Sequence, residues 1–394
     1  MLKDILIGRI RRAFNQPVRP QLMTFNVTGK CNCRCAMCDI YARTNAEEIT
    51  TPEIRKIFGD PLLRSLRILR ITGGEPFIRD DIAEIYDAAA QTPVRVFHIT
   101  TNAGFPEKIE GFLKSVNLSR THLKLQISLD AAGELHDKIR GVPGLFDRVV
   151  ATLERIKKFT GNRNFSAGIN QTVILQNMDE MERVHELARE YKIAHNIILG
   201  AKYCEGTAAT HYPSAGSPLP FELYQPMSGE QTEELYRRIA AMKRTHAQTT
   251  LRFASWSAWL RGISDEYLHE GGRNRLIKKR NFPKPICSAL FNHFRLLPDG
   301  TVTACTALRT QTAGNVRTHT LSKIWYSAEA GDIRRSVRKC PGCWVECDII
   351  PSAFFTGDII LWALKKVITG DSSFISSYLR PHWLIQTIRD GPKK

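Results

Sequence analysis

The chain has 394 residues, of which 43% are hydrophobic and 24% are charged, so it is expected to fold into two to three domains. A chain of this length buries a large core without covalent staples, which excludes a small disulfide scaffold, a disordered chain and a collagen-like fibre. Its net charge of +17 favours an anionic partner, which could be nucleic acid, anionic lipid or an acidic substrate. A solvated basic surface explains the charge equally well.

The first segment, residues 1–20, is basic and amphipathic. Its apolar residues recur near helical spacing and are Leu2, Ile5, Leu6, Ile10 and Phe14. The basic residues between them are Lys3, Arg9, Arg11 and Arg12. Residues 358–369, in the tail 351–394, repeat the pattern. Such helices can lie in a membrane interface, or dock on the core as ordinary helices. No apolar run approaches the ~20 residues of a membrane span, and the N-terminus lacks signal-peptide order. We expect a cytoplasmic protein, either free or peripheral on the inner membrane face.

The ten cysteines form two groups. In a reducing compartment, clustered cysteines indicate metal or iron–sulfur binding rather than disulfides. The first group is Cys31, Cys33, Cys35 and Cys38; the second is Cys287, Cys305, Cys340, Cys343 and Cys347. Cys204 stands apart, and it reads either as a reactive thiol or as an inert, packed cysteine.

Three cysteines of the first group, Cys31, Cys35 and Cys38, form the pattern C-x3-C-x2-C. A loop with this spacing can place thiolates at three corners of one cubane cluster. Structural zinc and iron–sulfur sites normally close with four ligands, so three ligands leave one iron open for another molecule. Cys33 is spaced too tightly to join them, and we interpret it as a bystander.

Around this loop, strand-like and helix-like segments alternate. The expected strands are residues 22–28, 66–72, 94–100, 122–128, 166–175 and 195–200, and the expected helices are 80–90, 106–118, 145–159 and 178–191. This alternation predicts six βα units and a parallel sheet, an α/β fold. Six units fit a partial (β/α)6 barrel over residues 21–202, whose functional groups would gather at the carboxyl ends of the strands.

Polar motifs follow three of these strands. The second strand is followed by Gly73-Gly74-Glu75-Pro76, where glycines allow close approach of a ligand to the backbone. Asn102 follows the third strand, and Ser128 and Asp130 lie at the end of the fourth. Ordinary turn and capping chemistry is the alternative explanation for each of them.

The chain changes character after residue 202. Residues 203–280 read as a linker with helices, one of them over 229–246. Residues 281–350 read as a small α+β domain, in which Pro298-Asp299-Gly300 predicts a β-hairpin with Cys287 before one arm and Cys305 at the end of the other. With Cys340 and Cys343 the hairpin could hold one tetrahedral site, and zinc would satisfy it as well as a cluster.

The loop and the Gly-Gly-Glu-Pro motif together resemble the radical S-adenosylmethionine (SAM) enzymes, whose fold is a partial barrel. The resemblance implies a [4Fe–4S] cluster on Cys31, Cys35 and Cys38 whose open iron is chelated by SAM. It also implies that the backbone at Met37 contacts adenine and that residues 73–76 bind the amino group of SAM. Asn102, Ser128 and Asp130 match places where the family contacts the ribose or the carboxylate.

The C-terminal cysteines resemble the auxiliary-cluster domain of the SPASM/twitch subgroup of these enzymes. The hairpin, Gly314-Asn315-Val316 and the terminal CxxC carry that resemblance. Five cysteines match the shortened form with one auxiliary [4Fe–4S] cluster, and it implies the ligands Cys287, Cys305, Cys340 and Cys343. Cys347 could replace one of them, in the first place Cys287.

The family reductively cleaves SAM to a 5′-deoxyadenosyl radical, which abstracts hydrogen from a substrate. The resemblance implies an oxidation or rearrangement assisted by the auxiliary cluster, with flavodoxin or ferredoxin as electron donor. The substrate could be a small molecule, a lipid-linked molecule or a peptide, and Cys204 could return a hydrogen atom, as in an epimerase. The alternative is a non-catalytic zinc or iron–sulfur module contacting nucleic acid. The open iron argues against that module, and the basic stretches lack the aromatic interleaving typical of nucleic-acid binding.

Overall fold

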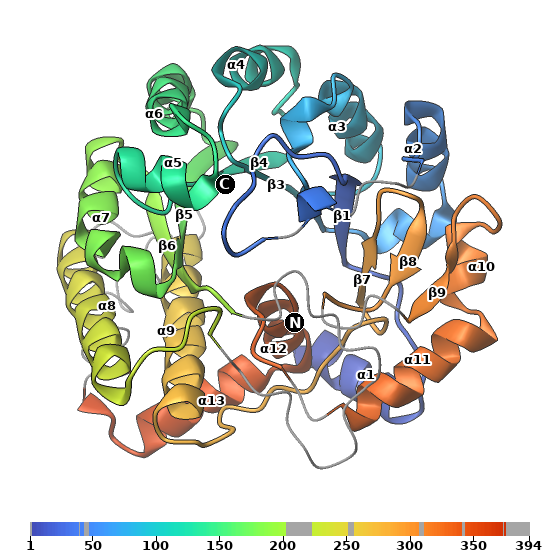
Figure 1. Ribbon diagram of the computed structural model, residues 1–394. Helices are drawn as coiled ribbons and strands as arrows, with labels where there is room; N and C mark the ends of the chain where they lie inside the picture. The colour runs from blue at the N-terminus through green and yellow to red at the C-terminus, as the bar shows by residue number, and fades with distance from the viewer. Residues whose placement is uncertain are drawn as a thin grey trace.

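The computed structural model describes residues 2–38, 40–42, 47–201, 223–250, 256–306, 311–340, 343–372 and 374–375. The expected hydrogen-atom donor Cys204 and most of the expected loop at the start of the linker lie outside these residues. Figure 1 shows the chain coloured from the N-terminus to the C-terminus, with the sheet curving around the centre of the molecule.

Nine strands form one sheet, in the order β6-β5-β4-β3-β2-β1-β7-β8-β9. The strands are β1 (Leu22–Thr28), β2 (Ile68–Gly73), β3 (Val96–Thr101), β4 (His122–Ser128), β5 (Phe165–Val173), β6 (Ala194–Leu199), β7 (His293–Leu296), β8 (Thr301–Thr303) and β9 (Thr312–Asn315). Strands β1 to β6 pair in parallel, each with the next along the chain. The predicted six βα units and the parallel sheet are therefore confirmed.

The sheet is accompanied by α-helices, several of which cover its outer side. They are α1 (Leu2–Ala13), α2 (Thr51–Phe58), α3 (Ile82–Ala90), α4 (Pro106–Ser115), α5 (Glu134–Arg140), α6 (Leu145–Ile156), α7 (Met181–Glu190), α8 (Gly229–Thr250), α9 (Trp256–Leu276), α10 (Leu321–Trp325), α11 (Ala328–Lys339), α12 (Glu346–Thr356) and α13 (Asp358–Ile368). In Figure 1, α3, α4, α6 and α7 lie outside the curve of strands, and α12 lies across the centre from β3 and β4.

Each parallel strand has an apolar face and a polar face. Leu69, Ile71 and Phe97 are at most 1% exposed and belong to the core under the outer helices. The residues between them, such as Arg70 and Thr72, point to the inside of the barrel, because side chains alternate between the two faces of a strand. The inner face of the sheet therefore carries polar side chains next to the site described below.

The C-terminal hairpin is present, but it is not a separate sheet. Strand β7 pairs in parallel with β1, in the register Leu22 with His293 and Phe25 with Leu296. Strands β8 and β9 then continue the sheet in antiparallel fashion. In a partial barrel of six strands, β1 would have an edge with unpaired N–H and C=O groups, and β7 satisfies them. The auxiliary-cluster segment is thereby fixed to the barrel.

The two termini of the described chain meet on one side of the molecule. The guanidinium of Arg9 on α1 donates to Asp358 Oδ1 at the start of α13, at 2.8 Å. Gly8 lies where a Cβ would be 2.7 Å from the Phe355 ring, so α1 approaches α12 closely. Among the described helices, none alone is long and apolar enough to cross a membrane, although the bent pair α12 and α13, at 76°, passes that test together.

Candidate functional site

The cysteine loop follows β1 and is held by the end of α5. The N–H groups of Arg34 and Ala36 donate to the carbonyl oxygens of Arg140 and Ile139, at 2.9 and 2.8 Å. Gly141 ends the helix in the left-handed conformation, with φ 67°, and a Cβ there would lie 2.7 Å from the carbonyl oxygen of Arg34. Glycine is therefore required where the cysteine loop rests on α5.

The Gly-Gly-Glu-Pro motif lies against the other end of the same loop. The N–H of Gly74 donates to Thr28 O at 2.8 Å, and the N–H of Glu75 donates to Lys30 O at 2.9 Å. Gly73 has φ 131°, and a Cβ on Gly74 would lie 2.5 Å from the carbonyl carbon of Lys30. The two glycines therefore let the end of β2 touch the segment that leads into the cysteines.

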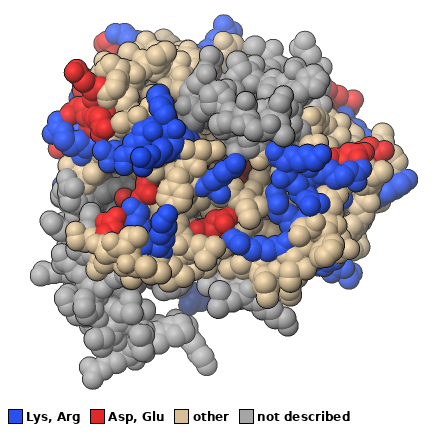
Figure 2. Space-filling model, turned by 90° about the horizontal axis from the view of Figure 1, so that it is seen from below, with Lys and Arg blue, Asp and Glu red and all other residues tan. Residues whose placement is uncertain are grey.

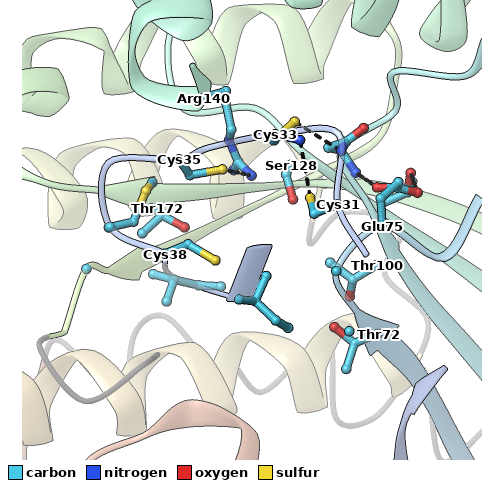
Figure 3. A pocket seen from close by; sticks show the side chains of 18 of the residues that line it. Cys31, Cys33, Cys35, Cys38, Thr72, Glu75, Thr100, Ser128, Arg140 and Thr172 are labelled. Atoms are coloured by element: carbon cyan, nitrogen blue, oxygen red, sulfur yellow. Dashed lines mark hydrogen bonds between the residues drawn. The ribbon is translucent and has the colours of Figure 1, made fainter. Parts of the chain in front are cut away.

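These elements enclose a cavity of about 210 Å³ that opens to solvent, at the carboxyl ends of the parallel strands (Figure 3). Its lining combines the four cysteines of the loop, the glycine motif and hydroxyl side chains from successive strands. It consists of Cys31, Cys33, Cys35, Met37, Cys38, Ile40, Thr72, Gly73, Gly74, Glu75, Thr100, Thr101, Asn102, Ser128, Arg140, Thr172, Ile198, Leu199, Gly200 and Ala201. Thiol, hydroxyl and backbone groups beside a few apolar side chains fit both a cluster and a nucleoside-like ligand.

The residues predicted for the first cluster and for SAM meet in this cavity, except for Pro76 and Asp130, which do not line it. Pro76 begins a short buried 3-10 turn, Pro76–Ile78. Asp130 is completely buried behind the wall, where its carboxylate accepts hydrogen bonds from Arg140 Nε at 2.6 Å and from the N–H of Thr172 at 2.9 Å. The expectation that Asp130 faces SAM is corrected, because Arg140 and the β5 backbone occupy both of its oxygens.

Arg140 is the main residue that the sequence did not single out. It lines the cavity, and its Nη1 lies 3.7 Å from Cys35 Sγ (Figure 3). Hydrogen bonding from Cys33 and the charge of Arg140 together lower the pKa of Cys35 to about 7, against the effect of burial. A cation held by a buried carboxylate therefore favours the thiolate form that a cluster requires. In the sequence, the only indication of this role is that Arg140 follows Asp130 by 10 residues.

Cys33 differs from its neighbours. Its thiol is 2% exposed, and Sγ accepts a hydrogen bond from Asn102 Nδ2 at 3.1 Å. Hydrogen bonds to Cys31 and Cys35 raise the pKa of Cys33 and lower the pKa of the other two. Cys33 thus keeps its proton while the flanking sulfurs become thiolates, which supports its interpretation as a bystander.

Glu75 connects the glycine motif to the next strand. Its carboxylate accepts from Thr101 Oγ1 at 2.8 Å, from the N–H of Asn102 at 2.6 Å and from the N–H of Phe77 at 3.0 Å. Burial nevertheless raises the pKa of Glu75 to about 7, because desolvation outweighs these donors. The residue as a whole is 1% exposed, so Glu75 fixes the wall of the cavity from behind.

The C-terminal cysteines form a second group around the hairpin. Burial and the neighbouring thiol of Cys340 raise the pKa of Cys287 to about 12. Burial, Asp348, Cys287 and Cys305 raise the pKa of Cys343. These thiols therefore lie close enough to act on one another electrostatically.

Cys347 has different neighbours. Its sulfur lies 3.3 Å from Thr306 Oγ1 and 3.5 Å from Arg295 Nη2, on the side of the inner sheet face. After burial, the groups acting most strongly on its pKa are Asp348 and Arg295. Cys347 therefore contacts side chains of β7 and of the segment after β8. Within the described ranges, no three His, Cys, Asp or Glu side chains converge on a position for a single metal ion.

Two family models match the chain. The radical SAM superfamily matches residues 25–188, and an iron–sulfur cluster-binding domain, SPASM, matches residues 287–348. The AdoMet-dependent heme synthase of Methanosarcina barkeri is 32% identical over 174 residues, which are 43% of this chain and 48% of that protein. The PqqA peptide cyclase of Ruegeria pomeroyi is 26% identical over 340 residues, 84% of this chain and 80% of that protein. The match to the heme synthase thus spans about half of its length.

Solved structures share the fold. Streptococcus suis SuiB bound to the precursor peptide SuiA has a TM-score of 0.56 at 16% identity, and covers 86% of this chain and 75% of that chain. Native anSMEcpe with bound AdoMet has a TM-score of 0.56 at 14% identity, and the match covers 88% of this chain and 98% of that chain. The radical SAM domain implies SAM and a [4Fe–4S] cluster, and the SPASM domain implies further iron–sulfur binding. The chain belongs to the radical SAM superfamily and carries a C-terminal cluster-binding domain of the SPASM type.

Proposed function

We propose that this protein cleaves SAM reductively and oxidises an organic substrate held inside the barrel. The observation that carries the proposal is the shared cavity of Cys31, Cys35 and Cys38 with the glycine motif. These cysteines would hold a [4Fe–4S] cluster with one open iron beside the backbone edge of Gly74 and Glu75. A purely structural site has no use for an open coordination position.

When bound, the cluster and SAM supply a 5′-deoxyadenosyl radical, which takes a hydrogen atom from the substrate. The protein residues position and shield this chemistry. Asp130 holds Arg140 beside Cys35, and the glycine contacts hold the loop against β2. The hydroxyl groups of Thr72, Thr100 and Ser128 project from neighbouring strands toward the same space (Figure 3). They give the cavity polar groups for a ribose or carboxylate.

The auxiliary site supports net oxidation. Removal of a hydrogen atom and then of an electron oxidises the substrate by two electrons. Cys287, Cys305, Cys340 and Cys343 would hold the cluster that we propose as acceptor of that electron. If four cysteines close this cluster, the substrate does not ligate it. We propose flavodoxin or ferredoxin as the source of the electron that starts the reaction.

A peptide is the substrate that the relatives favour. PqqA peptide cyclase matches over 84% of this chain, and SuiB with its precursor peptide shares the fold over 86%. The heme synthase, which matches less than half of the chain, favours a small molecule instead. Small and lipid-linked molecules are therefore the alternatives that an experiment must distinguish.

Deuterium transfer tests the reaction and the substrate together. The reconstituted enzyme is incubated with SAM, dithionite and an extract of fully deuterated cells, and 5′-deoxyadenosine is analysed by mass spectrometry. We expect deuterated 5′-deoxyadenosine with the extract and none with a triple Cys31→Ala, Cys35→Ala, Cys38→Ala variant. Protease treatment of the extract should abolish the transfer if the substrate is a peptide. Transfer that survives proteolysis would contradict the peptide proposal, and absence of 5′-deoxyadenosine would contradict the reaction.

We further propose that the side of the molecule formed by α1 and α13 contacts an anionic membrane. On α1, Leu6 and Ile10 are 60% and 50% exposed; on α13, Leu364 and Ile368 are 52% and 84% exposed. The ion pair of α1 with the start of α13 joins the two helices. Figure 2, seen from below, shows Lys and Arg side chains outnumbering acidic ones on this face. Apolar stripes within a basic surface match anionic lipid.

Vesicle flotation tests this contact. We expect the protein to float with phosphatidylglycerol-containing vesicles, to stay behind with pure phosphatidylcholine, and to be released by salt. The double variant Leu6→Ser, Leu364→Ser should float less. The matched control is Leu175→Ser, since Leu175 is 38% exposed in the 3-10 segment Leu175–Glu180 on the barrel. Equal flotation of the double variant and the control would contradict the proposal.

A further inference from the structure

Basic side chains form a row across the inner face of the sheet. The register pairs Arg70 with His98, and His98 with Lys124. On the other side it pairs Thr24 with both Arg70 and Arg295. Arg70, His98, Lys124 and Arg295 therefore lie at one level of the barrel, on four strands, with Thr24 of β1 between Arg70 and Arg295.

This row lies directly behind the cavity. Arg70 is two residues before Thr72, and His98 is two residues before Thr100; both threonines line the cavity. Residues two apart share a face of a strand and are separated by about 7 Å. A substrate whose reacting carbon meets the cavity would thus reach the basic row about 7 Å further into the barrel.

The opposite wall of this space is α12. The Nη1 of Arg70 donates to Cys347 O at 2.8 Å, so its side chain reaches from the sheet to the start of that helix. Burial and Asp265 raise the pKa of Glu346, whereas Arg70 and Lys124 act to lower it. Glu346 is therefore close enough to interact electrostatically with Arg70 and Lys124.

The row carries donors with no partner in the structure. In the described part of the chain, His98 Nε2 and Arg295 Nε are buried without hydrogen-bond partners. The other two nitrogens of Arg295 donate to Asn26 and Thr306. Burial, with Arg261 and Arg70 beside it, lowers the pKa of Lys124 to about 8. Buried cations are costly unless an anion or hydrogen bonds accompany them. Glu346 and Asp265 act on Lys124 electrostatically, and an anionic group of a substrate would add a direct partner for it.

We propose that Arg70 and Lys124 form a subsite for a carboxylate or phosphate group of the substrate. The inference rests on the proposed function and narrows the substrate to an acidic molecule, such as a peptide with an acidic side chain. Arginine offers a planar pair of donors to an oxyanion, and lysine offers a point charge. Arg70 also contacts the backbone of Cys347, so the anion would sit between the SAM cavity and the auxiliary-cluster segment.

Chemical labelling of Lys124 tests the subsite without turnover. An amine with a pKa near 8 reacts with acetic anhydride faster than ordinary surface lysines, and mass spectrometry follows each lysine in the reconstituted protein. The probes are glutarate for a carboxylate and inorganic phosphate for a phosphate. We expect one of them to slow the acetylation of Lys124 by roughly ten-fold or more at saturation, since a bound anion raises its pKa and covers the nitrogen. Lys108, which is exposed, is the internal control and should be unaffected.

The variants sharpen the test. Arg70→Gln should weaken protection of Lys124 by roughly ten- to a hundred-fold, the usual effect of losing a charge-assisted hydrogen bond. The matched control is Arg64→Gln, at an exposed residue of the 3-10 segment Pro61–Ser65, and its Lys124 should be protected as in the wild type. If Arg70→Gln does not fold, the subsite is tested by the acetylation rate of Lys124 in the wild type, with and without each anion. Protection by glutarate or by phosphate identifies the group.

Two results would overturn the subsite: Lys124 labelled at the same rate with and without both anions, or equal weakening in the two arginine variants. Neither result depends on SAM cleavage. Protection of Lys124 in a protein that forms no 5′-deoxyadenosine would leave the subsite standing and refute the proposed reaction. Cleavage of SAM without protection of Lys124 would support the proposed reaction and refute the subsite.

Discussion

Gly74→Ala should detach the glycine motif from the cysteine loop. The new Cβ would lie 2.5 Å from the carbonyl carbon of Lys30 and 2.9 Å from the carbonyl oxygen of Gly29. Carbon atoms pack at about 3.5–4.0 Å, so β2 and the loop must move apart by about 1 Å. Both contacts are backbone atoms, which cannot rotate away. The hydrogen bonds of Gly74 and Glu75 to this segment would lengthen by the same amount.

The cost of this overpacking is about 1–3 kcal/mol of stability. A displacement of 1 Å between reacting groups lowers the rate by roughly a hundred-fold, and we expect that loss in SAM cleavage. The assay measures SAM affinity and 5′-deoxyadenosine formation on reconstituted protein. The matched control is Gly111→Ala, because Gly111 lies in α4 with nothing near its Cβ position. It should be neutral or slightly stabilising. Wild-type cleavage by Gly74→Ala would refute the assigned role of this contact.

Three further predictions concern the buried groups. Cys343→Ala should lose about four irons per chain, and Cys347→Ala should keep them, as measured by iron analysis and EPR. Equal loss of iron in both variants would contradict a ligand set that excludes Cys347. Asp130→Asn should lower the free energy of unfolding by about 3–5 kcal/mol in urea, because it leaves the buried Arg140 without its counter-charge; a loss below about 1 kcal/mol would show that the pair is dispensable. The pKa of Glu75 is about 7 against 4.5 for an ordinary glutamate. The folded apo-protein therefore favours protonated Glu75, and its stability should fall by about 3 kcal/mol as the pH rises from 4.5 to 7. Glu75→Gln should remove this slope, and an unchanged slope would assign it to another group.

The sequence predicted the barrel because short β-rich runs alternate with helical segments, and polar motifs follow three of these runs. The expected bounds of the first and fourth strands agree with β1 and β4. The second and third begin two residues later than expected, at Ile68 and Val96. Hydrophobic pattern alone does not mark where the ladder with the neighbouring strand starts.

The sequence could not reveal what depends on contacts between distant segments. The pairing of β7 with β1 joins residues about 270 apart, and no local pattern records it. Arg140 reads as an ordinary basic residue in the last turn of a helix until the structure places it between Asp130 and Cys35. Asp130 was expected at the cavity because it follows a strand, yet tertiary contacts turn its carboxylate away from the cavity. The basic row became visible only once the register aligned Arg70 with Lys124 through His98.

The most direct measurement of the central claim is iron and sulfide content together with SAM cleavage, in wild type and in the triple Cys31→Ala, Cys35→Ala, Cys38→Ala variant. After anaerobic reconstitution, two cubane clusters predict about eight irons per wild-type chain and about four in the variant. Dithionite reduction should then give 5′-deoxyadenosine with the wild type alone. Zinc in place of iron, or a fully loaded wild type that leaves SAM intact, would contradict the account.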